Sequence, residues 1–265
     1  MKKNLFVRLT TLVLSLMMVF ACAAALAEDS DTAYVQNKGT LIVGITDFEP
    51  MDYMVDGDWT GFDAELAKVV GEKLGVEVVF QEINWSMKET ELAGYTIDCI
   101  WNGLTWSEER AENMGMTDPY MLNRQVIVVR QGTEFADAAA FAGVSVAAES
   151  GSAGEEFIAA MLPDAEYIEK DVQIDALTEL LFGTVDAAVL DYTMAYYLIN
   201  AEGSDFASLA ILDGEGLQGE DEYYAIAFRK GSDLVDTVNE ILDTFLEDGT
   251  LYNVALQYGL EGAIL

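Results

Sequence analysis

Asn102, Thr105 and Arg110 lie close enough together in the sequence to act on one polar ligand. An amide, a hydroxyl and a guanidinium supply hydrogen-bond donors and acceptors, and the planar fork of the guanidinium suits a carboxylate in particular. The chemistry that these residue types favour is therefore the binding of a carboxylate. The alternative for Arg110 is a solvent-exposed ion pair with its sequence neighbours Glu108 or Glu109.

The segment that carries these side chains is predicted to be a strand, a loop and a helix. Residues 97–101 are apolar apart from Asp98, as in a strand that is covered on both faces. Asn102-Gly103 interrupts this pattern, and Ser107 is a suitable N-cap for a helix that runs to Met114. The polar side chains thus lie at or just beyond the carboxyl end of a strand, where open α/β sheets bind their ligands.

Asp191 and Ser152 have comparable positions later in the chain. Asp191 follows an apolar strand predicted over residues 185–190, and a carboxylate there is placed to bind an ammonium group. Capping of a helix predicted over residues 192–200 is the alternative. Ser152, with Glu155 three residues later, predicts a capping box at a helix start, whose free N–H groups also bind carboxylates.

The rest of the chain alternates strands with helices, which predicts an α/β fold with parallel sheets. The clearest helix covers residues 62–74, and Asp63, near its start, is expected to be a cap. The polar residues 28–37 are expected to be a flexible lead-in. Further strands are predicted over residues 40–46, 76–80, 123–130, 144–148, 209–212 and 222–228, and further helices over residues 152–162, 175–182 and 234–246.

The composition excludes several classes of function. The 265 residues include no histidine, which removes Ser-His-Asp triads, Cys-His pairs and His-ligated metals, and we expect no metal and no cofactor. The formal net charge of −34 predicts a surface that repels nucleic acid and anionic lipid. Cys99 lies in the apolar strand and is expected to be a small core residue.

The N-terminus is typical of a secretory signal peptide. A positive start is followed by an apolar stretch over residues 9–20, which is shorter than a membrane span, and Ala25-Leu26-Ala27 fits a cleavage site. We therefore predict a signal peptide over residues 1–27 and an extracytoplasmic mature protein. The alternative is a lipid anchor on Cys22, which lies in an imperfect lipobox.

The segment Asp98-Cys-Ile-Trp-Asn-Gly-Leu-Thr-Trp-Ser-Glu-Glu-Arg110, followed by Asp118-Pro-Tyr120, resembles the signature of a known family. The family is the polar amino-acid-binding proteins of ABC importers, solute-binding family 3. Its pattern is roughly Asp-x-Ile-x-x-Gly-Leu/Met-Thr/Ser-x-Thr/Ser-x-x-Arg and then Pro-Tyr, and the resemblance extends over nearly the whole mature chain.

The resemblance implies the type II periplasmic-binding architecture, in which two α/β lobes are joined by two hinge strands with the ligand cleft between them. The first lobe would comprise residues 36–126 and 227–265, and the second would comprise residues 127–226. The strands predicted over residues 123–130 and 222–228 would be the two crossings between the lobes.

The resemblance also implies how the charged groups of a ligand are bound. Arg110 would bind the α-carboxylate of an amino acid, with help from Thr105 and from N–H groups near Ser152. Asp191 would bind the α-ammonium group, and a backbone carbonyl near Gly103 would share it.

Aromatic residues would enclose the ligand side chain. Phe48 and Trp85 would form the two walls, although plain core packing is an equal alternative for Phe48. Asn102 is the expected specificity contact. Trp101 and Trp106 flank the signature segment and are expected to pack rather than to contact the ligand.

The implied function is the capture of a free L-amino acid by a monomer that delivers it to an ABC transporter permease, without enzymatic turnover. Two alternatives remain open. One is a secreted dehydratase, since such enzymes share this fold, with Asp47 or Glu49 as a general acid in the cleft. The other is a ligand-sensing domain.

Overall fold

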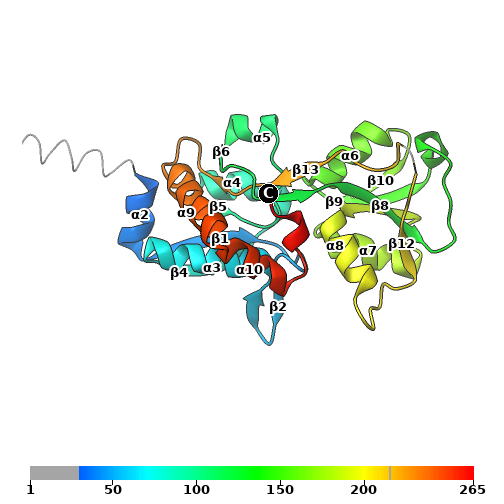
Figure 1. Ribbon diagram of the computed structural model, residues 1–265. Helices are drawn as coiled ribbons and strands as arrows, with labels where there is room; N and C mark the ends of the chain where they lie inside the picture. Colours follow the sequence, from blue (N-terminus) through cyan, green and yellow to red (C-terminus); the bar gives the residue numbers. More distant parts are fainter. Residues whose placement is uncertain (1–29, 215) are drawn as a thin grey trace, which may run out of the picture.

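The computed structural model describes residues 30–214 and 216–265, so the predicted signal peptide, its cleavage site and Cys22 lie outside the described residues. The described chain forms two α/β lobes that lie side by side (Figure 1). Within these ranges, no helix combines the length and the apolar character that crossing a membrane requires.

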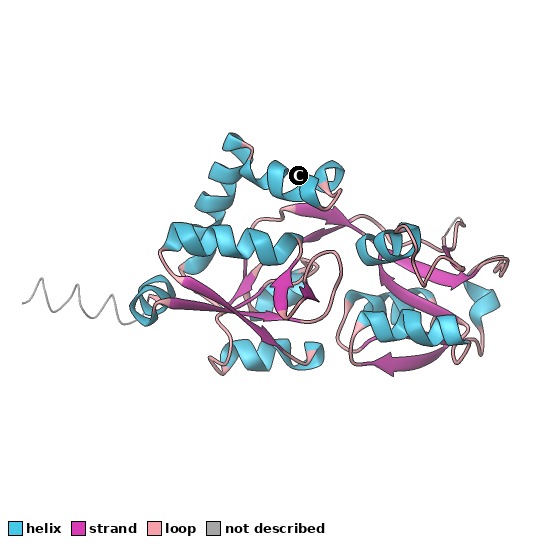
Figure 2. Ribbon diagram, turned by 90° about the horizontal axis from the view of Figure 1, so that it is seen from below, coloured by secondary structure: helices cyan, strands magenta, loops and turns pink. Residues whose placement is uncertain are grey.

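The first lobe is built on a five-stranded sheet with the order β4-β1-β5-β14-β6. β1 is parallel to both of its neighbours, whereas the late strand β14 is antiparallel to β5 and β6. Helices lie on both faces of this sheet (Figure 2). The strands are β1 (Thr40–Ile45), β4 (Glu77–Glu82), β5 (Cys99–Ile100), β6 (Gly115–Met116) and β14 (Ala227–Phe228), and the helices are α3 (Phe62–Leu74), α4 (Lys88–Ala93), α5 (Glu108–Asn113), α9 (Leu234–Asp248) and α10 (Thr250–Gln257).

The second lobe repeats this architecture with the strand order β10-β9-β11-β8-β12. β9 is parallel to β10 and β11, so the carboxyl ends of these strands meet at one edge of the sheet. The strands are β8 (Gln125–Arg130), β9 (Ser145–Glu149), β10 (Glu166–Lys170), β11 (Ala187–Asp191) and β12 (Leu209–Ile211), and the helices are α6 (Ala153–Met161), α7 (Gln173–Phe182) and α8 (Tyr192–Asn200).

Two short antiparallel strands, β7 (Met121–Asn123) and β13 (Glu222–Tyr224), connect the lobes (Figure 1). Each predicted crossing was a single strand, over residues 123–130 and 222–228, but the structure divides both. The reason is that β7 and β13 pair with each other, whereas β8 and β14 pair within the sheets of the lobes. The lobe boundaries at residues 126/127 and 226/227 stay predictions.

A helix, α2 (Asp31–Lys38), forms where the sequence predicted a flexible lead-in. That expectation is wrong from Asp31 onward. Ser30 caps the helix, Val35 is fully buried, and Nε of Arg229 lies 3.0 Å from a carboxylate oxygen of Asp31. The anchor is thus a residue almost 200 positions away, which local sequence patterns do not indicate.

α3 covers the predicted residues, but Asp63 does not cap it. Gly61 occupies the N-cap position, and the buried carboxylate of Asp63 instead accepts hydrogen bonds from the Gly103 amide and the Tyr120 hydroxyl, both at 2.7 Å. The prediction of a helix cap is therefore wrong. Asp63 fixes the loop that follows β5 and carries the signature residues.

We predict that Gly103→Ala destabilises the protein by about 2–4 kcal/mol, because the residue has a positive φ of 55° and a Cβ would overlap Cε1 of Phe48. Gly75→Ala is the matched control, since its φ is 75° but nothing lies within 4 Å of its Cβ position. Urea denaturation of both variants measures the difference. Equal losses would show that Phe48 does not restrict the loop.

Candidate functional site

A small cavity between the lobes brings together every predicted site residue except Phe48. Its volume is about 10 Å³, which is about enough for one water molecule. An amino acid therefore needs the lobes to part before it can enter. The lining residues are Trp85, Asn102, Gly103, Thr105, Arg110, Glu149, Ser152, Ala153, Gln173 and Asp191.

Strand ends position the charged residues of this cavity. Arg110 lies on α5, which follows β5 in the first lobe, and Asp191 is the last residue of β11 in the second lobe. Ser107 caps α5 as predicted, by accepting a hydrogen bond from the Arg110 amide. The carboxyl edges of the two sheets thus face each other, with a cation on one side and a carboxylate on the other.

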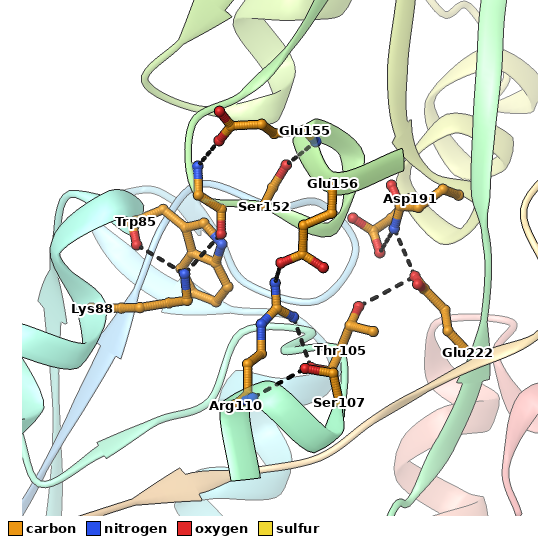
Figure 3. A network of polar contacts seen from close by, with 12 residues as sticks. Trp85, Lys88, Thr105, Ser107, Arg110, Ser152, Glu155, Glu156, Asp191 and Glu222 are labelled. Carbon is orange, nitrogen blue, oxygen red and sulfur yellow. Dashed lines mark hydrogen bonds and ion pairs between the residues drawn. The ribbon is translucent and has the colours of Figure 1, made fainter. Parts of the chain in front are cut away.

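Arg110 makes an ion pair across the cavity. Its Nη2 lies 2.8 Å from Oε1 of Glu156 on α6, and its Nη1 donates to the Thr105 carbonyl at 2.7 Å (Figure 3). The expected alternative, a pair with Glu108 or Glu109, is wrong, because the guanidinium points away from the surface and is 6% exposed. Glu156 is 61% exposed, so solvent screens this pair and weakens it.

The carboxylate of Asp191 is held by neutral donors. Tyr224 donates to Oδ1 at 2.8 Å and Gln173 to Oδ2 at 2.7 Å, while Asn123 and Gln125 also donate to Oδ1. The side chain makes no capping bond to α8, so the helix-cap alternative is wrong. Burial raises the pKa of Asp191, and these donors oppose that rise. Within the described ranges, no lysine or arginine forms an ion pair with Asp191.

Glu222 is a second carboxylate on the hinge, and sequence reasoning missed it. It lies on β13 and accepts hydrogen bonds from Thr105 at 3.2 Å, Asn123 at 2.7 Å and Gln125 at 2.6 Å. Burial and then the charge of Asp191 raise its pKa to about 7. The Thr105 hydroxyl therefore contacts Glu222, while its carbonyl holds Arg110.

The start of α6 has the predicted Ser152 cap, but the return bond to Glu155 comes from the Gly151 amide and not, as in a capping box, from the Ser152 amide. Ser152 accepts a hydrogen bond from the Glu155 amide, and the Glu155 carboxylate accepts one from the Gly151 amide at 2.6 Å. Lys88, from the first lobe, donates to the Gly151 carbonyl at 2.8 Å and so fastens this loop across the cavity (Figure 3). Burial, and then the nearby charge of Arg110, lower the pKa of Lys88 to about 8.

The amide of Asn102, the predicted specificity contact, is already bonded within the first lobe. Its Oδ1 accepts from the amide and hydroxyl of Thr46, and its Nδ2 donates to the Thr46 carbonyl and to Asp52. These bonds join the ends of β1 and β5. Asn102 lines the cavity, but its hydrogen-bonding groups brace the loop.

Of the predicted aromatic walls, only Trp85 lines the cavity. Phe48 is 2% exposed and packs edge-on against Tyr224, with ring centroids 6.3 Å apart. Its contacts match the core-packing alternative. Trp101 is fully buried in the core and Trp106 is 38% exposed, and neither lines the cavity.

A larger hollow of about 750 Å³ lies between α8, β7 and the C-terminal residues. Met121, Leu122, Asn123 and Arg124 are among the residues that line it, and Asn123 also donates a hydrogen bond to Asp191. None of the predicted site residues lines this hollow. The smaller cavity, with opposite charges from two lobes, is the candidate functional site.

Two α/β lobes with a charged cavity between them, joined by paired hinge strands, define a type II periplasmic binding protein. The chain belongs to the bacterial extracellular solute-binding proteins, family 3, whose family model matches residues 41–261.

Relatives and solved structures agree with this class. The arginine-binding extracellular protein ArtP of Bacillus subtilis is 28% identical, over 89% of this chain and 93% of its own length. A histidine-bound substrate-binding protein of an ABC uptake transporter from Streptococcus pneumoniae is 29% identical, with a TM-score of 0.81 over 89% of this chain and 99% of that one. An ancestral amino acid-binding protein, a precursor of cyclohexadienyl dehydratase, is 28% identical, with a TM-score of 0.79 over 86% and 99%.

We predict that the unfolding free energy of the ligand-free protein falls as the pH rises from about 5 to 8. The folded-state pKa values of Glu222 and Asp63 are raised to about 7, so both groups hold a proton more tightly in the folded protein. The stability that Glu222 and Asp63 add to the folded protein is fully present below the pKa values that the two groups have in the unfolded chain. It is lost as the pH rises through their folded-state pKa values of about 7. Glu222→Gln should flatten the pH dependence in thermal unfolding, whereas the exposed Glu220→Gln should not; identical profiles would contradict this.

We predict that Glu156→Gln tightens the binding of a carboxylate-bearing ligand by up to about fivefold. Glu156 occupies the guanidinium of Arg110, and an ion pair with one exposed partner is worth about 0–1 kcal/mol. Glu109→Gln is the matched control, because it removes an exposed carboxylate next to Arg110 that makes no such bond. Calorimetric titration measures both, and weaker binding by Glu156→Gln would show that Glu156 supports the ligand rather than competes with it.

Proposed function

We propose that this protein captures a free L-amino acid outside the cytoplasm and delivers it to an ABC transporter permease. One observation carries the proposal: Arg110 from the first lobe and Asp191 from the second line the same cavity. An amino-acid zwitterion has the complementary pair of charges. Bound by both residues, it bridges the lobes and holds them together.

The contacts of Arg110 and Asp191 support different roles for the two groups. On ligand binding, Arg110 exchanges the exposed carboxylate of Glu156 for the carboxylate of the ligand. The buried guanidinium therefore has an anionic partner both before and after the ligand binds. Asp191 keeps its neutral donors and gains the ammonium group. Because its donors include Asn123 of β7 and Tyr224 of β13, ammonium binding acts directly on both hinge strands. Closure then presents a joined surface of the two lobes to the permease.

The relatives support the ligand class and the partner. They include an arginine-binding extracellular protein, and the structural neighbours include a histidine-bound protein of an ABC uptake transporter. A monomeric state, removal of residues 1–27 and the alternative lipid anchor on Cys22 belong to the same proposal.

A dehydratase-type enzyme is the second candidate, because one structural neighbour is described as the precursor of such an enzyme. Burial raises the pKa of both Asp47 and Glu49, as a general acid requires. Neither residue lines the cavity, however. Incubation with a prephenate-like acid separates the candidates, since an enzyme releases product over many turnovers and a binding protein does not.

The proposal predicts one bound L-amino acid per chain and binding at least about 30-fold weaker for the corresponding decarboxylated amine, because the amine leaves Arg110 without its carboxylate. A thermal-shift screen of the common amino acids and cystine identifies the ligand, and calorimetry then compares it with its amine. Equal affinity for the amine would show that Arg110 does not bind the carboxylate of the ligand.

Variants distinguish the two ends of the zwitterion. Loss of one partner of a buried charge pair costs about 2–5 kcal/mol, so Arg110→Ala and Asp191→Ala should each bind at least about 30-fold more weakly. Asp191→Ala should also reduce ligand-induced compaction in small-angle scattering. If that variant binds and compacts like the wild type, the ammonium site lies elsewhere.

A further inference from the structure

Glu149 is a cavity residue whose bonding the proposed function leaves unexplained. It is the last residue of β9, as Asp191 is the last residue of β11, and these strands are parallel neighbours in one sheet. The two carboxylates therefore lie at the same edge of the sheet, and both line the cavity. Glu149 was not among the predicted site residues, although its position at a strand end follows the rule that singled out Asp191.

Glu149 is 2% exposed, and its Oε1 has no hydrogen-bond partner among the described residues. Asp191, by contrast, accepts hydrogen bonds from four side chains. Burial raises the pKa of Glu149 well above its usual value, the charge of Asp191 raises it further, and Lys88 lowers it. A buried oxygen without a donor costs about 1–3 kcal/mol of stability, a cost that a bound cationic group would offset.

The neighbouring cations do not satisfy Glu149. Nζ of Lys88 donates to the Gly151 carbonyl at 2.8 Å and to the Trp85 carbonyl at 3.3 Å, and no ion pair joins it to Glu149 in the described part of the chain. Arg110 is engaged by Glu156. The site thus has a third ionisable side chain, beyond Arg110 and Asp191, and its Oε1 has no hydrogen-bond partner among the described residues.

We propose that Glu149 binds a cationic side-chain group, a guanidinium or an ammonium, and that the cavity therefore selects basic L-amino acids. This inference rests on the proposed function, in which Arg110 and Asp191 bind the backbone charges of the ligand. A basic amino acid has three charges, and the cavity then supplies an opposite partner for each of them.

The balance of charge around the cavity supports this ligand class. Four acidic residues, Glu149, Asp191, Glu156 and Glu222, line or border the cavity, whereas its cations are Lys88 and Arg110. A neutral zwitterion leaves Glu149 buried without a partner, and an acidic side chain adds repulsion. A ligand with a net charge of +1 reduces the excess of acidic groups, and a site that pairs a buried charged group rejects an analogue that lacks the partner.

The test compares L-arginine with L-citrulline, which has nearly the same shape but a neutral side chain, by calorimetric titration of the purified protein. L-Lysine and L-glutamine serve as a second pair. A hydrogen bond to a charged group contributes about 1.5–3 kcal/mol of binding free energy. We therefore predict that a basic amino acid whose side chain reaches Glu149 binds about 10- to 100-fold more tightly than its neutral partner.

Glu149→Gln should remove that preference. Its affinity for L-arginine should fall by about 10- to 100-fold, while its affinity for L-citrulline should stay within about threefold of the wild type. The melting temperature of the ligand-free variant should rise, because a buried carboxyl without a partner is replaced by a neutral amide; this also reports that the variant is folded. Glu169→Gln, an exposed position on the adjacent strand β10, is the matched control and should change neither affinity.

The outcomes separate this inference from the proposed function. If neither basic amino acid binds more tightly than its neutral partner, or if Glu149→Gln keeps the full preference for the basic ligand, the Glu149 subsite is overturned while amino-acid capture stands. If no amino acid of the wider screen binds at all, the proposed function itself fails, and the subsite fails with it.

Discussion

The structure depends on the burial of carboxylates that the protein does not neutralise with its own cations. Asp191, Glu222 and Glu149 all lie in or beside the interlobe cavity, and burial raises the pKa of each. An internal lysine or arginine would relieve this cost, but it would also occupy the place that we propose for a ligand ammonium group. Asp191 and Glu222 accept hydrogen bonds from neutral donors instead. These bonds favour the ionised carboxylate, but they add no positive charge, so a cation can still bind beside it.

The two sides of the cavity differ in how firmly they are held. On the first lobe, Asp63 fixes the Gly103 amide, and Asn102 ties the end of β5 to Thr46 and Asp52, so the signature loop is braced from behind. Across the cavity, the contacts are an ion pair from Arg110 to an exposed glutamate and a hydrogen bond from Lys88 to a backbone carbonyl. Contacts of this kind exchange readily, as a site that must open requires.

Tyr224 links the braced loop to the second lobe. Its ring packs against Phe48, which in turn lies against Gly103, while its hydroxyl donates to Asp191 at 2.8 Å. Because Tyr224 belongs to hinge strand β13, one side chain contacts the loop, the hinge and the proposed ammonium site. Phe48, which the resemblance assigned to the ligand, is thus placed to support this residue instead.

The sequence by itself determined the features that arise from interactions between near neighbours. The strand, loop and helix around Arg110, the Ser107 cap, the extent of α3 and the Ser152 cap all follow from periodicity and hydrogen bonds that span a few residues. The rule that ligands bind at strand ends placed Asn102, Thr105, Arg110 and Asp191 in one site, and the resemblance added Trp85, Gly103 and Ser152. Only the tertiary structure decided the partners: Glu156 for Arg110, the Gly103 amide for Asp63, the Thr46 backbone for Asn102 and four donors for Asp191. Apart from the bond between Gln173 and Asp191, these contacts join residues more than 30 positions apart, and the packing of sheets and lobes selects among many chemically equivalent partners that the sequence offers.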